Sequence, residues 1–160
     1  MNNDFNNYPE DSMVWVYQSD HFFTASEKEA IQNKVSNFLQ KWDSHGHPVK
    51  GSYAIIEDAF IVIAADGQGT QLCGRAQSAS IFMITELEQE LGIKLLDRTN
   101  QTYKSNGTIK FVALNDFKSL YQQGAINEDT LVFDNTVINK KDFDNKWQVA
   151  LKDSWHKRFV

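Results

Sequence analysis

The order of apolar and polar positions along the chain predicts a strand followed by a helix in its first quarter. Residues 13–17 (MVWVY) are β-branched and aromatic, which is typical of a strand. Two possible capping boxes follow, Thr24-x-x-Glu27 and Ser26-x-x-Glu29, and each can satisfy free N–H groups at a helix start. Large apolar residues then recur at helical spacing: Ile31, Val35, Phe38 and Trp42. We expect this helix to end at the segment HGHPV (45–49).

A hairpin and a second helix are predicted next. Residues 52–56 and 60–65 flank the short segment EDA, and residues 60–65 (FIVIAA) are apolar on both faces, as in a central strand. A Gly-rich segment then leads into a helix that Gly92 ends. Its apolar stripe is Ile81, Ile84, Leu87 and Leu91. An extended stretch within residues 95–103 completes the order β-α-β-β-α-β, the split βαβ arrangement.

The character of the chain changes from Ser105. The triplet SNG indicates a turn, and strands are expected at residues 109–114 and 131–137, with a short helix at 116–123 between them. A last helix is expected from the i, i+4, i+8 spacing of Phe143, Trp147 and Leu151. The sequence therefore predicts an α+β protein in three parts. These are a mobile polar tail (1–12), a βαββαβ core (13–104) and a small C-terminal αβ extension (105–160) packed on the core.

Composition narrows the class of protein. The 160 residues are 41% hydrophobic, which is enough for a real core. A net charge of −5 argues against a broad nucleic-acid surface. No apolar run is long enough to span a bilayer, and the first residues do not resemble a secretory signal. The single cysteine excludes an internal disulfide framework, and these features together lead us to expect a cytoplasmic protein.

The Gly-rich segment is a near match to a nucleotide-binding motif. Residues 69–76 read G-x-x-x-x-G-R-A, whereas the phosphate-binding P-loop reads G-x-x-x-x-G-K-[ST]. Arg75 stands in place of the lysine, and Ala76 has no hydroxyl for Mg²⁺, so ATP hydrolysis is not expected. Backbone N–H groups of Gly67, Gly69 and Gly74, together with Arg75, could still bind a phosphate or another anion.

Cys73 is the candidate nucleophile. It lies at the predicted start of the second helix, where the helix dipole and Arg75 would stabilise a thiolate. His45 is the candidate base, if the fold brings the two side chains together. The alternative is that Cys73 is a small buried apolar residue. His45, His47 and the nearby Asp43 are too few for a metal site, so neither a metal nor another cofactor is expected.

Several segments together carry a resemblance to a known family. They are VWVYQSD (14–20), FLQKWDSHG (38–46), FIVIAAD (60–66), CGRAQSASIFMITELEQELGIKLLDR (73–98), TLVFDNTV (130–137) and DSWHKRF (153–159). The chain resembles an uncharacterised family of short bacterial proteins that often carry the label "ABC transporter ATPase". The resemblance implies a bacterial protein and brings no established activity with it. In that family a small polar residue typically follows the cysteine, whereas here Gly74 and Arg75 follow Cys73.

These observations favour a binding or regulatory module without enzymatic activity. Its partner would be another protein or a small anionic ligand, and neither nucleic acid nor a membrane-spanning segment is expected. Two alternatives stay open. One is a Cys73-dependent enzyme or thiol sensor in which His45 assists. The other is a phosphate or nucleotide binder that uses residues 69–75 without hydrolysis.

Overall fold

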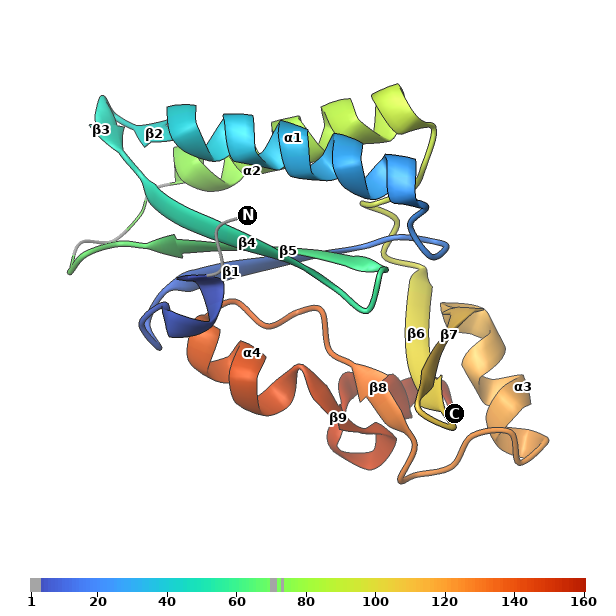
Figure 1. The fold of residues 1–160 in the computed structure, drawn as a ribbon. Helices are drawn as coiled ribbons and strands as arrows, with labels where there is room; N and C mark the ends of the chain where they lie inside the picture. Colours follow the sequence, from blue (N-terminus) through green and yellow to red (C-terminus); the bar gives the residue numbers. More distant parts are fainter. Residues whose placement is uncertain (1–3, 70–71, 73) are drawn as a thin grey trace.

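The computed structural model describes residues 4–69, 72 and 74–160. Its first layer is a three-stranded antiparallel sheet in the order β1-β5-β4, built from β1 (Met13–Gln18), β4 (Lys50–Ile56) and β5 (Phe60–Asp66). Two helices, α1 (Ala25–Lys41) and α2 (Gly74–Leu91), lie side by side over one face of this sheet (Figure 1). Mixed helices and antiparallel sheets confirm the predicted α+β class.

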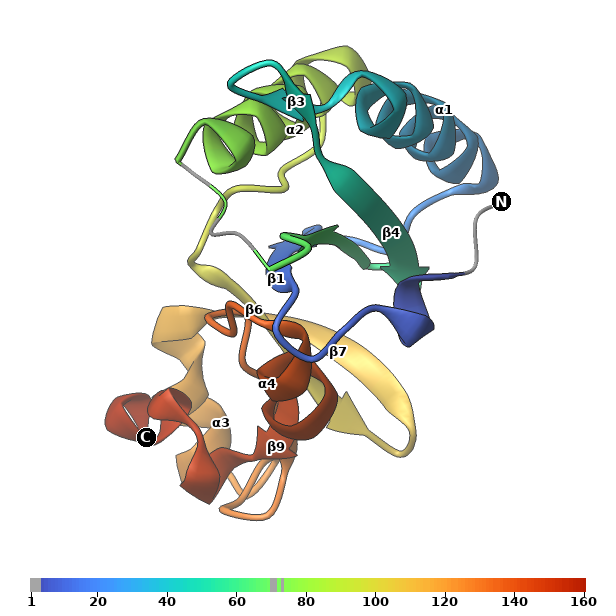
Figure 2. The same cartoon turned by 90° about the vertical axis from the view of Figure 1, so that its left-hand side faces the viewer.

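The central strand β5 is buried on both faces. Its side chains alternate, as in any strand, so that Ile61 and Ile63 face the helices while Phe60 and Val62 face the opposite side. Both faces are therefore apolar, and each needs a cover. Figure 2 shows the result: the helices lie above the sheet, and the C-terminal half of the chain lies below it.

Local chemistry fixes both ends of α1. The hydroxyl of Thr24 accepts the N–H of Glu27 at 3.1 Å, and the Glu27 carboxylate accepts the N–H of Thr24 at 2.9 Å, which confirms the predicted capping box. At the other end, the Trp42 indole N–H donates to the carbonyl of Ala76 at 3.1 Å. The Trp42 ring lies so close to Gly51 that an added Cβ there would be only 2.8 Å from it. The end of α1 is thereby tied to the start of α2.

The buried face of α2 differs from the predicted stripe. Ile84 and Leu87 are buried as expected, but Ile81 is exposed. The core face instead includes Ser80, whose hydroxyl lies 2.9 Å from the hydroxyl of the buried Tyr17. A hydrogen-bonded serine therefore takes a position that a hydrophobic pattern alone assigns to a large apolar residue.

A second antiparallel sheet replaces the single split βαβ sheet. It has the order β7-β6-β8-β9 and comprises β6 (Asn100–Ser105), β7 (Thr108–Ala113), β8 (Leu131–Phe133) and β9 (Gln148–Ala150). The strand expected to complete the first sheet is thus β6 of the second. The outer edge of β1 is covered differently, because the N–H of Val14 donates to the carbonyl of Ile138 at 3.0 Å and Met13 bridges to Asn139.

Short elements complete the described chain. A small hairpin of β2 (Asp43–Ser44) and β3 (His47–Pro48) follows α1. The helix α3 (Phe117–Gln122) precedes β8, and α4 (Lys140–Lys146) precedes β9. Four 3₁₀ helices are η1 (Asp4–Asn7), η2 (Leu114–Asp116), η3 (Leu151–Asp153) and η4 (Trp155–Phe159). The predicted last helix therefore stops at Lys146, and Leu151 lies beyond a strand. No helix of the described residues has the length and apolar character needed to cross a membrane.

The described part of the N-terminal segment, for which a mobile tail is predicted over residues 1–12, packs on α4. Phe5 and Tyr8 are buried, and the Phe5 ring meets the Phe143 ring of α4 edge-on, 5.6 Å between centroids. The backbone N–H groups of Lys140 and Lys141 donate to carbonyls of this segment. The aromatic rings of Phe5 and Tyr8 bury apolar surface in a segment that is otherwise polar and Asn-rich.

The core below the first sheet generates a stability prediction. Phe60 is fully buried and contacts the rings of Phe133 and Trp147, with centroids 5.0 and 4.9 Å away. We expect Phe60→Ala to lower the free energy of unfolding by about 3–5 kcal/mol, through lost burial and a cavity. The control, Phe82→Ala on α2, removes a ring that is 67% exposed and should change stability by less than about 0.5 kcal/mol. Urea unfolding of both variants measures this, and equal losses would contradict the assignment of Phe60 to the core.

Candidate functional site

The Gly-rich segment borders a hollow at one end of the first layer. The Asp66 carboxylate accepts the N–H of Gln68 at 2.8 Å, and both Gln68 and Gly69 adopt positive φ, so the chain turns sharply after β5. The hollow has a volume of about 380 Å³. Its described lining residues come from three separate segments: Asp11, Met13, Gly67, Gly69, Leu72, Ile138 and Asn139.

The other predicted site residues lie at the same end of the molecule. Gly74 and Arg75 are exposed in the first turn of α2. His45 is exposed in the turn of the β2–β3 hairpin, and β2 contacts α2 (Figure 1). Cys73 lies outside the described residues, so its pairing with His45 stays a prediction.

The lining of the hollow carries one described charged group, a carboxylate. Asp11 is the one charged residue among the described lining residues, and Asp66 lies at the base of the adjoining turn with Lys50 3.7 Å away. Residues 67–73 (GQGTQLC) contain no lysine or arginine. Next to Asp11 a cation is favoured over an anion, since like charges raise the energy of a bound group, whereas Arg75 at the start of α2 is the nearby positive group.

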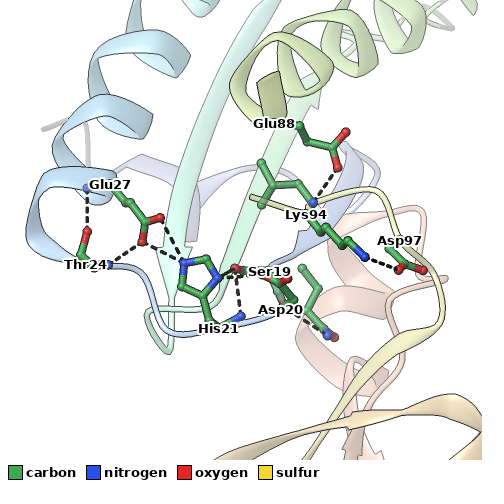
Figure 3. A network of polar contacts seen from close by, with 10 residues as sticks. Ser19, Asp20, His21, Thr24, Glu27, Glu88, Lys94 and Asp97 are labelled. Carbon is green, nitrogen blue, oxygen red and sulfur yellow. Dashed lines mark hydrogen bonds and ion pairs between the residues drawn. The ribbon is translucent and has the colours of Figure 1, made fainter. Parts of the chain in front are cut away.

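A second cluster of polar side chains surrounds His21, between β1 and α1 (Figure 3). Its Nδ1 lies 2.7 Å from Oδ1 of Asp20, and its Nε2 lies 2.9 and 3.1 Å from the two carboxylate oxygens of Glu27. The hydrogen bond with Asp20 raises the pKa of His21 above its usual value; partial burial opposes this, and Glu27 adds to it. Burial alone would raise the pKa of Glu27, but hydrogen bonds from Thr24 and His21 lower it on balance.

This cluster contains the residue types of a catalytic triad, but its serine is fully buried. The Ser19 hydroxyl lies 3.4 Å from Nδ1 of His21, while Glu27 is bound to the other ring nitrogen. A general base must be neutral to accept a proton, whereas the contacts with two carboxylates raise the pKa of His21 and favour its charged form. Ser19 is also fully buried and accepts the N–H of His21 at 3.2 Å. The hydrogen bonds of the cluster order residues 19–24.

His156 is in the opposite environment. It is buried, the Ser154 hydroxyl bonds to its Nδ1, and its Nε2 lies 2.7 Å from Oε1 of Gln101. Because the amide oxygen only accepts, Nε2 carries the proton and Nδ1 accepts from Ser154. Burial lowers the pKa of His156 to about 4, so the ring is neutral near pH 7. No group of three or more His, Cys, Asp or Glu in the described ranges could hold a metal ion.

Comparison with known proteins gives no relative: no family model, no curated protein and no solved structure matches the chain. The resemblance to the family of short bacterial proteins therefore stays a prediction.

Sequence reasoning missed the His21 cluster, although a signal for it was present. The tripeptide Ser19-Asp20-His21 lies two residues before the capping box of Thr24 and Glu27. A glutamate at the third helical position turns back toward the residues before the helix. A histidine three residues before the N-cap is then within its reach.

The environment of His156 generates a prediction on pH and stability. Between its unfolded pKa near 6.5 and its folded pKa of about 4, only the unfolded chain binds a proton at this ring. Stability should therefore fall as the pH falls through this range, by up to about 3 kcal/mol from this group. In His156→Gln this contribution to the pH dependence of the free energy of unfolding should vanish. Urea unfolding at pH 7, 5.5 and 4.5 measures it, with the exposed His47→Gln as the matched control. A variant slope equal to that of the native protein would contradict the assignment.

Proposed function

We propose that this protein is a non-enzymatic binding module of the bacterial cytoplasm and that its ligand binds in the hollow beside the Gly-rich segment. The observation that carries the proposal is the apolar wall of this hollow. Met13, Leu72 and Ile138 contribute to it, and Ile138 is 67% exposed. An apolar wall with a few polar groups beside it is typical of a ligand-binding hollow.

The charge of the lining suggests the class of ligand. Asn139 is occupied as the cap of α4, because its Oδ1 accepts the N–H of Asp142 at 2.8 Å. Asp11 forms no ion pair with any described residue, so its carboxylate is the group available to recognise charge. A ligand with an apolar stem and a positive end suits this combination. A lysine or arginine side chain of a partner protein has that form, and the net charge of −5 would speed its approach.

The two alternatives make different demands. An anion binder would use the N–H groups of Gly67, Gly69 and Gly74 with Arg75, against the field of Asp11 and Asp66. A thiol enzyme would need a stabilised thiolate at Cys73. Phosphate as a probe distinguishes the anion binder from the proposal, and alkylation of Cys73 distinguishes the thiol enzyme.

The test is an NMR titration with three small probes. We expect n-hexylammonium to shift the methyl signals of Met13 and Ile138, whereas hexanoate and inorganic phosphate leave them unchanged. Asp11→Asn should weaken the binding of the amine roughly tenfold, the equivalent of about 1.4 kcal/mol for one charge-assisted hydrogen bond. Glu29→Gln, at an exposed carboxylate of α1, is the matched control and should leave affinity unchanged.

Other outcomes would replace the proposal. Phosphate shifts at the amides of Gly67 and Gly69 would favour the anion binder. Rapid alkylation of Cys73 with an apparent pKa below about 7 would favour the thiol enzyme or sensor. If hexylammonium shifts neither methyl group, the hollow does not bind a cationic apolar ligand.

A further inference from the structure

The two contacts of the His21 ring require two protons. A charged imidazole donates from both nitrogens, and here each nitrogen faces a carboxylate, Asp20 at 2.7 Å and Glu27 at 2.9 Å. A neutral imidazole has one N–H. Its other nitrogen would then present a lone pair to a carboxylate oxygen, which is repulsive. The two contacts therefore cannot both persist when His21 loses a proton.

The surroundings decide which contact is lost. The Glu27 side chain is 15% exposed and is held by a second hydrogen bond from the N–H of Thr24. The Asp20 side chain is 37% exposed and forms no other hydrogen bond with a described residue, so it can turn to water at little cost. The Ser19 oxygen accepts the N–H of His21 and lies 3.4 Å from Nδ1, which leaves its hydroxyl proton free to donate to that nitrogen.

We propose that residues 19–24 form a pH-sensitive latch. In the closed state, the His21 ring bridges Asp20 and Glu27. In the open state, the neutral ring keeps Glu27 through Nε2–H, accepts the Ser19 hydroxyl at Nδ1 and releases Asp20 to water. The latch lies at the opposite end of β1 from the hollow (Figures 1 and 3), and it does not depend on the function proposed there.

Neighbouring charged groups are paired with one another. Lys28 of α1 lies 3.2 Å from Asp58 in the β4–β5 turn, and Lys94 lies 4.0 Å from Asp97 in the segment after α2 (Figure 3). Asp20 and Glu27 are thus the carboxylates in contact with His21 among the described residues.

The latch acts on a junction between the two sheets. The N–H groups of Ser19 and Phe23 donate to carbonyls of the β4–β5 turn at 2.8 and 2.7 Å, and these backbone groups do not titrate. Between them, the half-exposed ring of Phe22 contacts the ring of Phe111 on β7, 5.1 Å between centroids. Opening of the latch should therefore loosen the contact between Phe22 and the second sheet.

The direction of the pH response follows from linkage. The folded protein raises the pKa of His21, so the stabilisation from the closed latch is fully present below the ordinary value near 6.5. It is lost as the pH rises through the folded pKa. The latch consequently opens on the alkaline side of that ordinary value.

An NMR titration of the full chain from pH 5.5 to 9 tests the latch. The ring nitrogens of His21, the carboxyl carbon of Asp20 and the ring signals of Phe22 and Phe111 are followed together. We expect one shared midpoint above 6.5, with Nε2 protonated and Nδ1 bare at the alkaline end. The exposed His47→Gln is the control and should leave this midpoint in place.

Two variants test the exchange of partners at Nδ1. Asp20→Asn should move the midpoint of His21 down, because it removes the contact that favours the charged ring most. Ser19→Ala should move the midpoint up, because the neutral ring loses its donor at Nδ1. A proton on Nδ1 in the neutral ring, or Phe22 and Phe111 signals that stay constant through the midpoint, would overturn the proposal. The tautomer measurement on the native chain decides even if a variant fails to fold.

Discussion

The burial of β5 on both faces is the constraint on which the other elements depend. An isolated layer of sheet and helices would leave Phe60 and Val62 in water, while an isolated C-terminal half would leave Phe133 and Trp147 uncovered. Each half supplies what the other needs, so neither side of the sheet is a free surface. The N-terminal segment closes the same core through Phe5, which explains why a polar stretch is anchored there.

Most elements of the first layer could be predicted from local chemistry. The pairing of strands far apart in the sequence could not. The capping box of Thr24 and the two-faced apolar run of β5 are complete within a few residues each. The pairing of β6 is not, because β6 pairs with β7 and β8 of the second sheet, while the outer edge of β1 meets Ile138, far along the chain. The spacing of Phe143, Trp147 and Leu151 favours a helix, but the tertiary contacts end that helix at Lys146. Here Trp147 packs on Phe60, and the chain then pairs with β8.

The candidate sites also differ in how much of each is local in sequence. The strand–loop–helix context of the Gly-rich segment could be predicted, since all its parts are adjacent in sequence. Its electrostatic character could not, because Asp11 and Ile138 reach the hollow from distant segments. The His21 cluster is an intermediate case. Every group in direct contact with the ring lies between Ser19 and Glu27, yet only the geometry of the capping box turns Glu27 toward His21.

His21 and His156 are held by hydrogen bonds in opposite protonation states. Both imidazoles use two hydrogen bonds to join segments of the chain. Where the partners are carboxylates and water is near, as at His21, the charged ring fits; where they are a hydroxyl and an amide in the interior, as at His156, only the neutral ring fits. The folded state keeps the hydrogen bonds of both rings only at a pH that is high enough for a neutral His156 and low enough for a charged His21. Because one pKa lies below the ordinary histidine value and the other above it, that condition holds around the ordinary value, where the unfolded chain titrates.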